Sequence, residues 1–248
     1  MAIFQGSIYS KLMEMDTGLT VFLPDCPHEQ KSEYPVLYLL HGLEANNSCW
    51  LHRTQIERYA AEHDFIVIMP EVQRSFYTDM AYGLPYFTYI SEELPKICQN
   101  LFPISKSPSN TFIAGFSMGG YGALKCGLRH PEKYGAVASF SGAVDIRNAL
   151  ENGTWSLSKE ETFGIFGNRL NPENDIRQLT VKASKENTQL PFLYLTCGLS
   201  DPLRDSNLEL KKQMEFLHIP HVYEEWAGGH DWFFWDKSIQ QFIKMITK

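Results

Sequence analysis

Short, uninterrupted apolar runs recur along the chain and constrain its fold more than any other feature of the sequence. They lie at residues 36–40, 66–69, 111–114, 136–140 and 192–196. Apolar runs without polar alternation are typical of strands buried on both faces, as in a parallel sheet. Further strands are expected at residues 4–10, 19–23 and 223–226, and helices at residues 55–63, 90–101, 120–129, 208–217 and 237–246. Because parallel strands need crossover connections, this alternation predicts a doubly wound α/β fold, with a mostly parallel central sheet and helices on both faces.

The 248 residues are expected to form a single domain, because no Pro/Gly/Ser-rich linker, long charge run or internal repeat divides them. A chain of 28.5 kDa buries enough surface to fold without disulfides or a metal. The polar segment 148–189 shows no clean helical or strand period. We expect it to form a small cap-like excursion over the edge of the sheet.

The charge balance excludes some partners. The chain has 22 Lys and Arg against 29 Asp and Glu, a net charge of −7, which argues against nucleic acid. No apolar run approaches the roughly 18 residues that cross a membrane, and the N-terminal segment lacks the pattern of a signal peptide. The five cysteines are widely spaced and contain no C-x-x-C, as in proteins with free thiols. We therefore expect a cytoplasmic protein.

A nucleophile motif follows the strand at residues 111–114. Residues 111–122 read TFIAGFSMGGYG and contain G-x-S-x-G between a strand and a helix, the context in which this motif carries a reactive serine. Ser117 would lie in a tight turn, where Gly115 and Gly119 let the backbone pass closely. The first N–H groups of the following helix would point toward the serine oxygen. The backbone N–H of Met118 is therefore predicted to bind an oxyanion.

A serine hydroxyl needs an adjacent base, and His230 is the best-placed of the eight histidines. It lies in AGGHDWFFW, after the expected strand at residues 223–226, and serine hydrolases with this type of sheet carry serine, acid and histidine in that order. Asp201 follows the strand at residues 192–196 and is the predicted acid, since sites form at the carboxyl edge of such sheets. Asp205 is expected to cap the next helix, and the side chain of Asp231 to diverge from its neighbour His230.

The loop His41-Gly42-Leu43 follows the strand at residues 36–40. In such hydrolases this loop supplies the second oxyanion N–H, and Leu43 is the predicted donor. His41 is then expected to be a structural loop residue. No H-E-x-x-H and no Cys/His cluster indicates a metal site, and no cofactor is expected.

Together these segments resemble the esterase D-like branch of the α/β-hydrolases, closest to the bacterial tributyrin esterases. The matching segments are VLYLLHG at Val36, the residue Trp50, YTD at Tyr77, EELP at Glu92, FIAGFSMGGYGA at Phe112, SFSGA at Ser139, CGLSDPL at Cys197 and GGHDWFFW at Gly228. The resemblance implies an α/β-hydrolase fold, a triad of Ser117, Asp201 and His230, and an oxyanion hole from Leu43 and Met118. The chain departs from the family at Glu44 and Ala45, where members often carry a glycine.

The resemblance implies a serine carboxylesterase that acts on small-molecule esters with short acyl chains, without cofactor or metal. Three alternatives remain open: a feruloyl or acetylxylan-type esterase, a thioesterase like S-formylglutathione hydrolase, and an inactive hydrolase fold used for binding. Tyr77, Tyr86, Trp155 and Trp232 are predicted to contact substrate and Trp235 to wall the same pocket, with packing in the core as the equal alternative for each. Related esterases often form dimers or tetramers, so a homo-oligomer is compatible with the chain.

Overall fold

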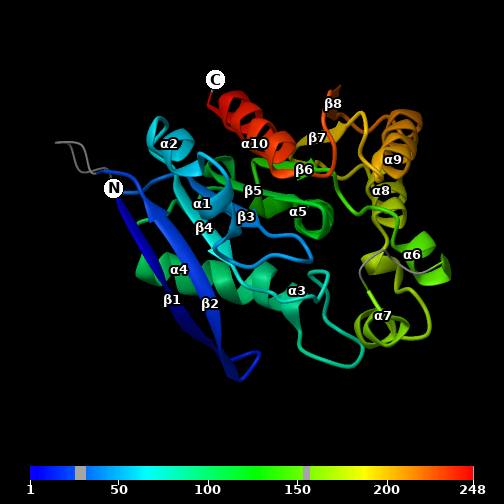
Figure 1. Cartoon of the computed structure of the whole chain (residues 1–248), viewed down its shortest axis with the longest axis horizontal. Helices are drawn as coiled ribbons and strands as arrows, with labels where there is room; N and C mark the ends of the chain where they lie inside the picture. The colour runs from blue at the N-terminus through cyan, green and yellow to red at the C-terminus, as the bar shows by residue number, and fades with distance from the viewer. Residues whose placement is uncertain (26–31, 153–156, 248) are drawn as a thin grey trace.

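A single sheet lies at the centre of the computed structural model, which describes residues 1–25, 32–152 and 157–247 (Figure 1). Its strands are β1 (Ala2–Ser10), β2 (Met15–Leu23), β3 (Val36–Leu40), β4 (Ile66–Pro70), β5 (Thr111–Phe116), β6 (Ala136–Phe140), β7 (Phe192–Gly198) and β8 (Val222–Trp226). Their order across the sheet is β1-β2-β4-β3-β5-β6-β7-β8. The doubly wound, mostly parallel sheet that the apolar runs predict is confirmed.

The order in which strands are added to the sheet reverses at β3. Strand β1 pairs antiparallel with β2, and β2 antiparallel with β4, whereas all further neighbours are parallel. After β3 the chain adds β4 on one side and then returns to add β5 on the other. Crevices outside the carboxyl ends of strands at such a switch point are where α/β proteins bind ligands.

Helices cover both faces of the sheet. They are α1 (Cys49–Arg53), α2 (Ile56–Ala61), α3 (Tyr86–Thr88), α4 (Leu94–Leu101), α5 (Met118–Arg129), α6 (Ile146–Asn152), α7 (Lys159–Phe166), α8 (Ile176–Lys185), α9 (Arg204–Phe216) and α10 (Trp232–Ile246). A π-helical turn (Tyr89–Glu93) joins α3 to α4. Apolar side chains of α4, α5, α8 and α9 pack on one face, and those of α1, α2 and α10 pack on the other. In Figure 1, α10 and α2 lie above the sheet and α4 lies below it.

Strand β3 shows why the apolar runs have no polar gaps. Val36, Tyr38 and Leu40 enter the core under α4 and α5, while Leu37 and Leu39 enter the core under α2 and α10. Because side chains alternate between faces, a strand covered on both sides must be apolar at every position.

Several elements extend beyond the ranges that the sequence predicts. Strand β5 continues to Phe116 and β7 to Gly198, which brings the strand ends close to Ser117 and Asp201. Helix α10 begins at Trp232 rather than near residue 237, because the side chain of Asp231 accepts the N–H of Phe234 and caps the helix.

The segment 148–189 differs from the expected excursion. It contains the end of α6, all of α7 and all of α8. Helix α8 packs against α5, and its residues Ile176, Leu179, Thr180 and Ala183 are buried, so α8 is part of the layer on the sheet and not a cap. Two of these four buried residues are threonine and alanine, so the large apolar side chains of α8 alone do not show a helical period. The prediction for Trp155 lies outside the described residues.

Candidate active site

Ser117 lies on the turn between β5 and α5. Its φ of 54° and ψ of −119° place a non-glycine residue in the left-handed region, a strained conformation that stable packing must enforce. A Cβ on Gly115 would come within 2.5 Å of the backbone of Gly119, and a Cβ on Gly119 within 2.5 Å of the Leu40 carbonyl oxygen. The two glycines therefore allow the close approach of β3, β5 and α5 that forms this turn.

The structure brings together the three residues that the motifs predict as a triad. His230 Nε2 lies 3.0 Å from Ser117 Oγ. His230 Nδ1 lies 3.0 Å from Oδ2 and 3.2 Å from Oδ1 of Asp201. Because a carboxylate only accepts, Nδ1 carries a proton that it donates to Asp201, and Nε2 is left to accept the serine hydroxyl proton. This chain of contacts can activate Ser117 as a nucleophile.

Two backbone amides are available beside Ser117. Met118 is the first residue of α5, and Leu43 lines the same cavity as Ser117. In the described part of the chain, no carbonyl or side-chain acceptor binds the backbone N–H of Leu43 or of Met118. Free N–H groups at this place can bind a developing oxyanion.

A cavity of about 390 Å³ opens over Ser117 and His230. Its walls are mostly apolar and aromatic, with two acidic residues beside them. The lining residues besides Ser117 and His230 are Leu43, Glu44, Ala45, Phe76, Phe116, Ala143, Asp231, Trp232 and Trp235. The loop residues Glu44 and Ala45 thus border the cavity directly.

Of the aromatic residues predicted to contact substrate, Trp232 lines the cavity, whereas Tyr77 and Tyr86 do not. Tyr77 and Tyr86 are buried and neither lines the cavity. The hydroxyl of Tyr77 instead donates to the backbone carbonyl of His41 at 2.9 Å. The prediction that these tyrosines contact substrate is therefore corrected: they belong to the scaffold, which was the alternative at the sequence level.

The role expected for Asp205 is also corrected. Helix α9 begins at Arg204, its N-cap residue is Leu203, and no side chain caps it. Asp205 is an exposed residue within the first turn. Asp231 caps α10 and also accepts the N–H of Gly229 at 3.1 Å, so its carboxylate is directed away from the ring of His230.

Sequence reasoning missed part of the cavity wall. Phe116 precedes the nucleophile in its own motif and was visible beside a predicted site residue. Trp235, expected from the sequence at the pocket wall, does line the cavity. Ala143 ends the SFSGA segment and Phe76 directly precedes the YTD segment, but neither segment by itself indicates a residue that lines a cavity. Trp235 packs edge-on against His230, with 4.9 Å between the ring centroids, and Phe116 stacks on Trp235 at 4.2 Å. These rings form a rigid wall beside the base.

The described residues contain no group of three or more His, Cys, Asp or Glu side chains placed to hold a metal ion. Within the same ranges, no helix combines the length and the apolar character needed to cross a membrane. Cys49, Cys98, Cys126 and Cys197 are free thiols.

The comparison with protein families decides the class of this site. The Esterase model, described as "Putative esterase", matches residues 10–246. The chain belongs to this esterase family. It is 32% identical over 266 residues to an acetyl esterase of Caldicellulosiruptor saccharolyticus, in an alignment that covers 100% of this chain and 99% of that protein.

Solved structures support the same class for this esterase. The substrate-bound fluorophosphonate-binding serine hydrolase FphF of Staphylococcus aureus is 32% identical and superposes with a TM-score of 0.92, covering 100% of this chain and 98% of its own. The S-formylglutathione hydrolase FrmB of Staphylococcus aureus is also 32% identical, with a TM-score of 0.90 and coverage of 100% and 99%. The α/β-hydrolase fold is thus confirmed, and the protein is a serine esterase. The particular likeness to tributyrin esterases and the cytoplasmic location stay predictions.

Proposed function

We propose that this esterase hydrolyses short-chain acyl esters through Ser117, His230 and Asp201. The contact of His230 Nε2 with Ser117 Oγ at 3.0 Å, in a cavity open to small molecules, carries the proposal. No cofactor or metal takes part in the proposed reaction.

The reaction proceeds in two halves. Ser117 Oγ attacks the ester carbonyl carbon while His230 Nε2 takes the hydroxyl proton, and the carbonyl oxygen becomes an anion that the N–H groups of Leu43 and Met118 bind. The tetrahedral intermediate collapses, His230 returns the proton to the leaving alcohol, and an acyl-serine remains. Water, deprotonated by His230, then attacks the acyl group, and Ser117 recovers its proton as the acid leaves. Asp201 stabilises the imidazolium in each half.

The size and lining of the cavity support a small acyl group. A volume of about 390 Å³ is near the lower end of the 300–1,000 Å³ that ligand pockets span. The rings of Phe76, Phe116 and Trp235 enclose it, each at most 5% exposed. Fixed rings of this kind favour a short apolar chain over a long one. Ferulate esters, with their larger phenolic acyl group, remain the first competing substrate class.

A thioesterase activity is the second candidate, since the chain is 32% identical to an S-formylglutathione hydrolase. The charges around the site disfavour it. Glu44 and Asp231 line the main cavity, and a neighbouring cavity of about 240 Å³, which shares Phe76 and Ala143 with it, is lined by Asp145, Asp205 and Glu209. Glutathione carries two carboxylates, which Glu44, Asp231 and Asp205 repel, whereas Asp145 and Glu209 are paired with Arg177. We expect a higher kcat/KM for a butyryl ester than for S-formylglutathione.

Substitution of the nucleophile tests the proposal. Ser117→Ala should stay folded and lose activity by roughly 10³-fold or more, because the acyl-enzyme cannot form. The assay compares kcat/KM for acetyl, butyryl, octanoyl and feruloyl esters, with a fluorophosphonate label to count active serines. Activity of Ser117→Ala within about tenfold of wild type would exclude the serine mechanism. A higher kcat/KM for methyl ferulate than for the short esters would favour the feruloyl esterase.

A further inference from the structure

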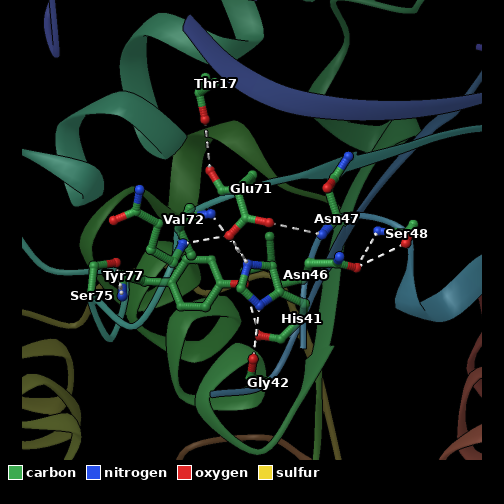
Figure 2. A network of polar contacts seen from close by, with 12 residues as sticks. Thr17, His41, Gly42, Asn46, Asn47, Ser48, Glu71, Val72, Ser75 and Tyr77 are labelled. Carbon is green, nitrogen blue, oxygen red and sulfur yellow. Dashed lines mark hydrogen bonds and ion pairs between the residues drawn. The ribbon is translucent and has the colours of Figure 1, made fainter. Parts of the chain in front are cut away.

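His41 is buried directly beneath the candidate oxyanion loop, with only 1% of its surface exposed. It does not line the cavity, and the proposed reaction gives it no step. Its Nδ1 lies 2.8 Å from the backbone carbonyl oxygen of the next residue, Gly42 (Figure 2). A carbonyl only accepts, so Nδ1 carries a proton and donates it to Gly42.

The Gly42 carbonyl and the Leu43 N–H belong to the same peptide unit. A trans peptide is planar, with its C=O and N–H pointing in opposite directions. Fixing the direction of the Gly42 oxygen therefore also fixes the direction of the Leu43 N–H. The N–H of Ala45 donates to the same oxygen at 3.2 Å, so two donors hold the Gly42 carbonyl. The Leu43 N–H of this peptide points in the opposite direction.

We propose that His41 is a positioning residue of the oxyanion hole, whose Nδ1–H holds the Gly42–Leu43 peptide so that the Leu43 N–H points at the carbonyl oxygen of the substrate. The inference deepens the proposed function and rests on it. His41 touches no reacting atom in this role. Rotation of this one peptide would remove an oxyanion donor without any change in the triad.

Glu71 and Val72, which follow β4, lie at the other side of the His41 ring. Glu71 Oε1 lies 3.3 Å from His41 Nε2, and the N–H of Val72 lies 3.2 Å from the same nitrogen. A neutral ring accepts the Val72 N–H, whereas a protonated ring donates to Glu71. Nδ1 keeps its proton in both states, so the bond to Gly42 does not depend on the charge of the ring.

Glu71 also ties the ring to the far end of the loop. Its Oε2 accepts the N–H of Asn47 at 3.2 Å, and its Oε1 accepts the N–H of Gln73 at 2.6 Å. Burial acts to raise the pKa of Glu71, but the hydrogen bonds and charge of His41 and these two N–H groups outweigh burial and lower it. The carboxylate is thus ionised at neutral pH. It fixes the loop through the N–H groups of Asn47 and Gln73, and it also accepts a hydrogen bond from Nε2 when the ring is protonated. Figure 2 shows these contacts around the ring.

The preceding peptide is held as well. The hydroxyl of Tyr77 donates to the His41 carbonyl at 2.9 Å, and Lys125 Nζ of helix α5 donates to the Tyr77 carbonyl at 3.0 Å. Both peptide units of His41-Gly42 therefore have a fixed carbonyl. The helix that begins beside Ser117 thus contributes to holding the loop that carries the second oxyanion donor.

Two substitutions of His41 separate positioning from packing. Asparagine places its amide N–H₂ where Nδ1 was, so His41→Asn keeps the donor to Gly42. Glutamine places its amide near the position of Nε2, so His41→Gln loses that donor while remaining close to the size of histidine. Both lose the ring, so both should lower the free energy of unfolding to a similar extent.

We expect His41→Gln to lower kcat on a p-nitrophenyl butyrate substrate by on the order of 10²-fold with little change in KM, as when an oxyanion donor is removed. His41→Asn should stay within about tenfold of wild type. A trifluoromethyl ketone gives a second readout, because Ser117 Oγ adds to its carbonyl carbon, His230 takes the serine proton and the ketone oxygen becomes the anion. Its inhibition constant should rise for His41→Gln in proportion to the loss of kcat/KM.

Equal kcat for the two variants, or an unchanged ketone inhibition constant in His41→Gln, would overturn the inference. If His41→Gln cannot be obtained folded, Tyr77→Phe removes the hydrogen bond to the His41 carbonyl and so tests whether fixing the preceding peptide positions the loop. It should lower kcat several-fold at constant KM and weaken ketone binding equally, and no change in either would count against the inference. Failure of the proposed function itself gives a different result, since Ser117→Ala would then keep the activity.

Discussion

Asp201 is the most enclosed member of the candidate triad. Its side chain has no exposed surface, whereas that of His230 is 26% exposed. Oδ1 accepts the N–H of Leu203 at 2.8 Å, which fixes the carboxylate before it meets the ring. A rigid acceptor at Nδ1 determines which nitrogen of His230 carries the proton. At the scale of single residues, the tautomer of His230 is therefore set by Asp201.

Asp201→Asn should lower kcat by roughly 10⁴-fold with a folded structure, because the amide N–H₂ facing Nδ1 favours the tautomer that carries its proton on Nε2. That nitrogen can then no longer accept the proton of Ser117. The measurement is kcat on a butyryl ester, with circular dichroism to check folding.

Asp231→Asn is the matched control, because Asp231 is adjacent to His230 and lines the same cavity. Asparagine caps helices about as well as aspartate, so kcat should change only a few-fold. Asp205→Asn, at an exposed position of α9, should likewise have little effect. A severe loss in either control beside a mild loss in Asp201→Asn would assign the acid differently.

The sequence indicates the three residues of the candidate triad because each follows a strand and carries a local motif, and the structure brings them into contact. The network around His41 has no such signal. Glu71 lies 30 positions and Tyr77 lies 36 positions after His41 in the sequence, so only the folded sheet brings them together. The sequence also places Tyr77 wrongly at the cavity. An aromatic residue near a motif has the same sequence signal whether its ring contacts substrate or packs in the core.

At the scale of an element, helix α10 depends on one side chain for its start. Asp231 Oδ1 accepts the N–H of Phe234 at 3.0 Å, and Oδ2 accepts the N–H of Gly229 at 3.1 Å. The cap thus also closes the turn that carries His230. Asp231→Ala should lower the free energy of unfolding by about 1 kcal/mol and should reduce kcat/KM as the turn loosens.

Urea unfolding of Asp231→Ala and Asp231→Asn measures this contribution directly. The asparagine variant keeps an oxygen acceptor and should unfold close to wild type. Equal destabilisation of both variants would show that charge near the helix N-terminus, and not the cap, holds α10.

The elements themselves were predictable to different degrees. Strands buried on both faces, such as β3 and β6, appear as apolar runs with the observed limits. Helix α8 was missed because threonine and alanine occupy half of its buried stripe, and α1 because five residues are too few to show a period. Helix starts were placed too late where a polar cap, not an apolar residue, begins the helix, as at α10.

At the scale of the whole molecule, buried Lys125 joins helix α5 to the loop that follows β4. Its Nζ donates to the Tyr77 carbonyl at 3.0 Å and to Thr78 Oγ1 at 3.1 Å, and it lies 4.6 Å from the centroid of the Phe87 ring. Loss of hydration on burial lowers the pKa of Lys125 from 10.5 to about 7, and the charge of Arg129 adds to this effect. The carboxylates of Asp79 and Glu173 act in the opposite direction.

This lowered pKa determines how stability should depend on pH. Between about pH 7 and 10.5 the unfolded chain binds a proton at Lys125 that the folded chain does not bind. The free energy of unfolding therefore rises with pH across this window, by at most about 1.4 kcal/mol per pH unit from this group. Below pH 7 both states are protonated, and the folded state bears the cost of a buried charge.

Lys125→Met isolates this contribution, because methionine keeps a long unbranched side chain and removes the titrating group. The free energy of unfolding of wild type minus that of Lys125→Met should increase by on the order of 3 kcal/mol from pH 7 to pH 10, since the other groups common to both proteins cancel in the difference. Lys96→Met removes the same charge from a side chain that is 73% exposed. The free energy of unfolding of this variant should change with pH in the same way as that of wild type. If the difference for Lys125→Met were also independent of pH, the hydrogen bonds that Lys125 donates to Tyr77 and Thr78, together with the Phe87 ring, would be strong enough to keep Lys125 protonated inside the fold. The buried network would then carry a full positive charge at every working pH.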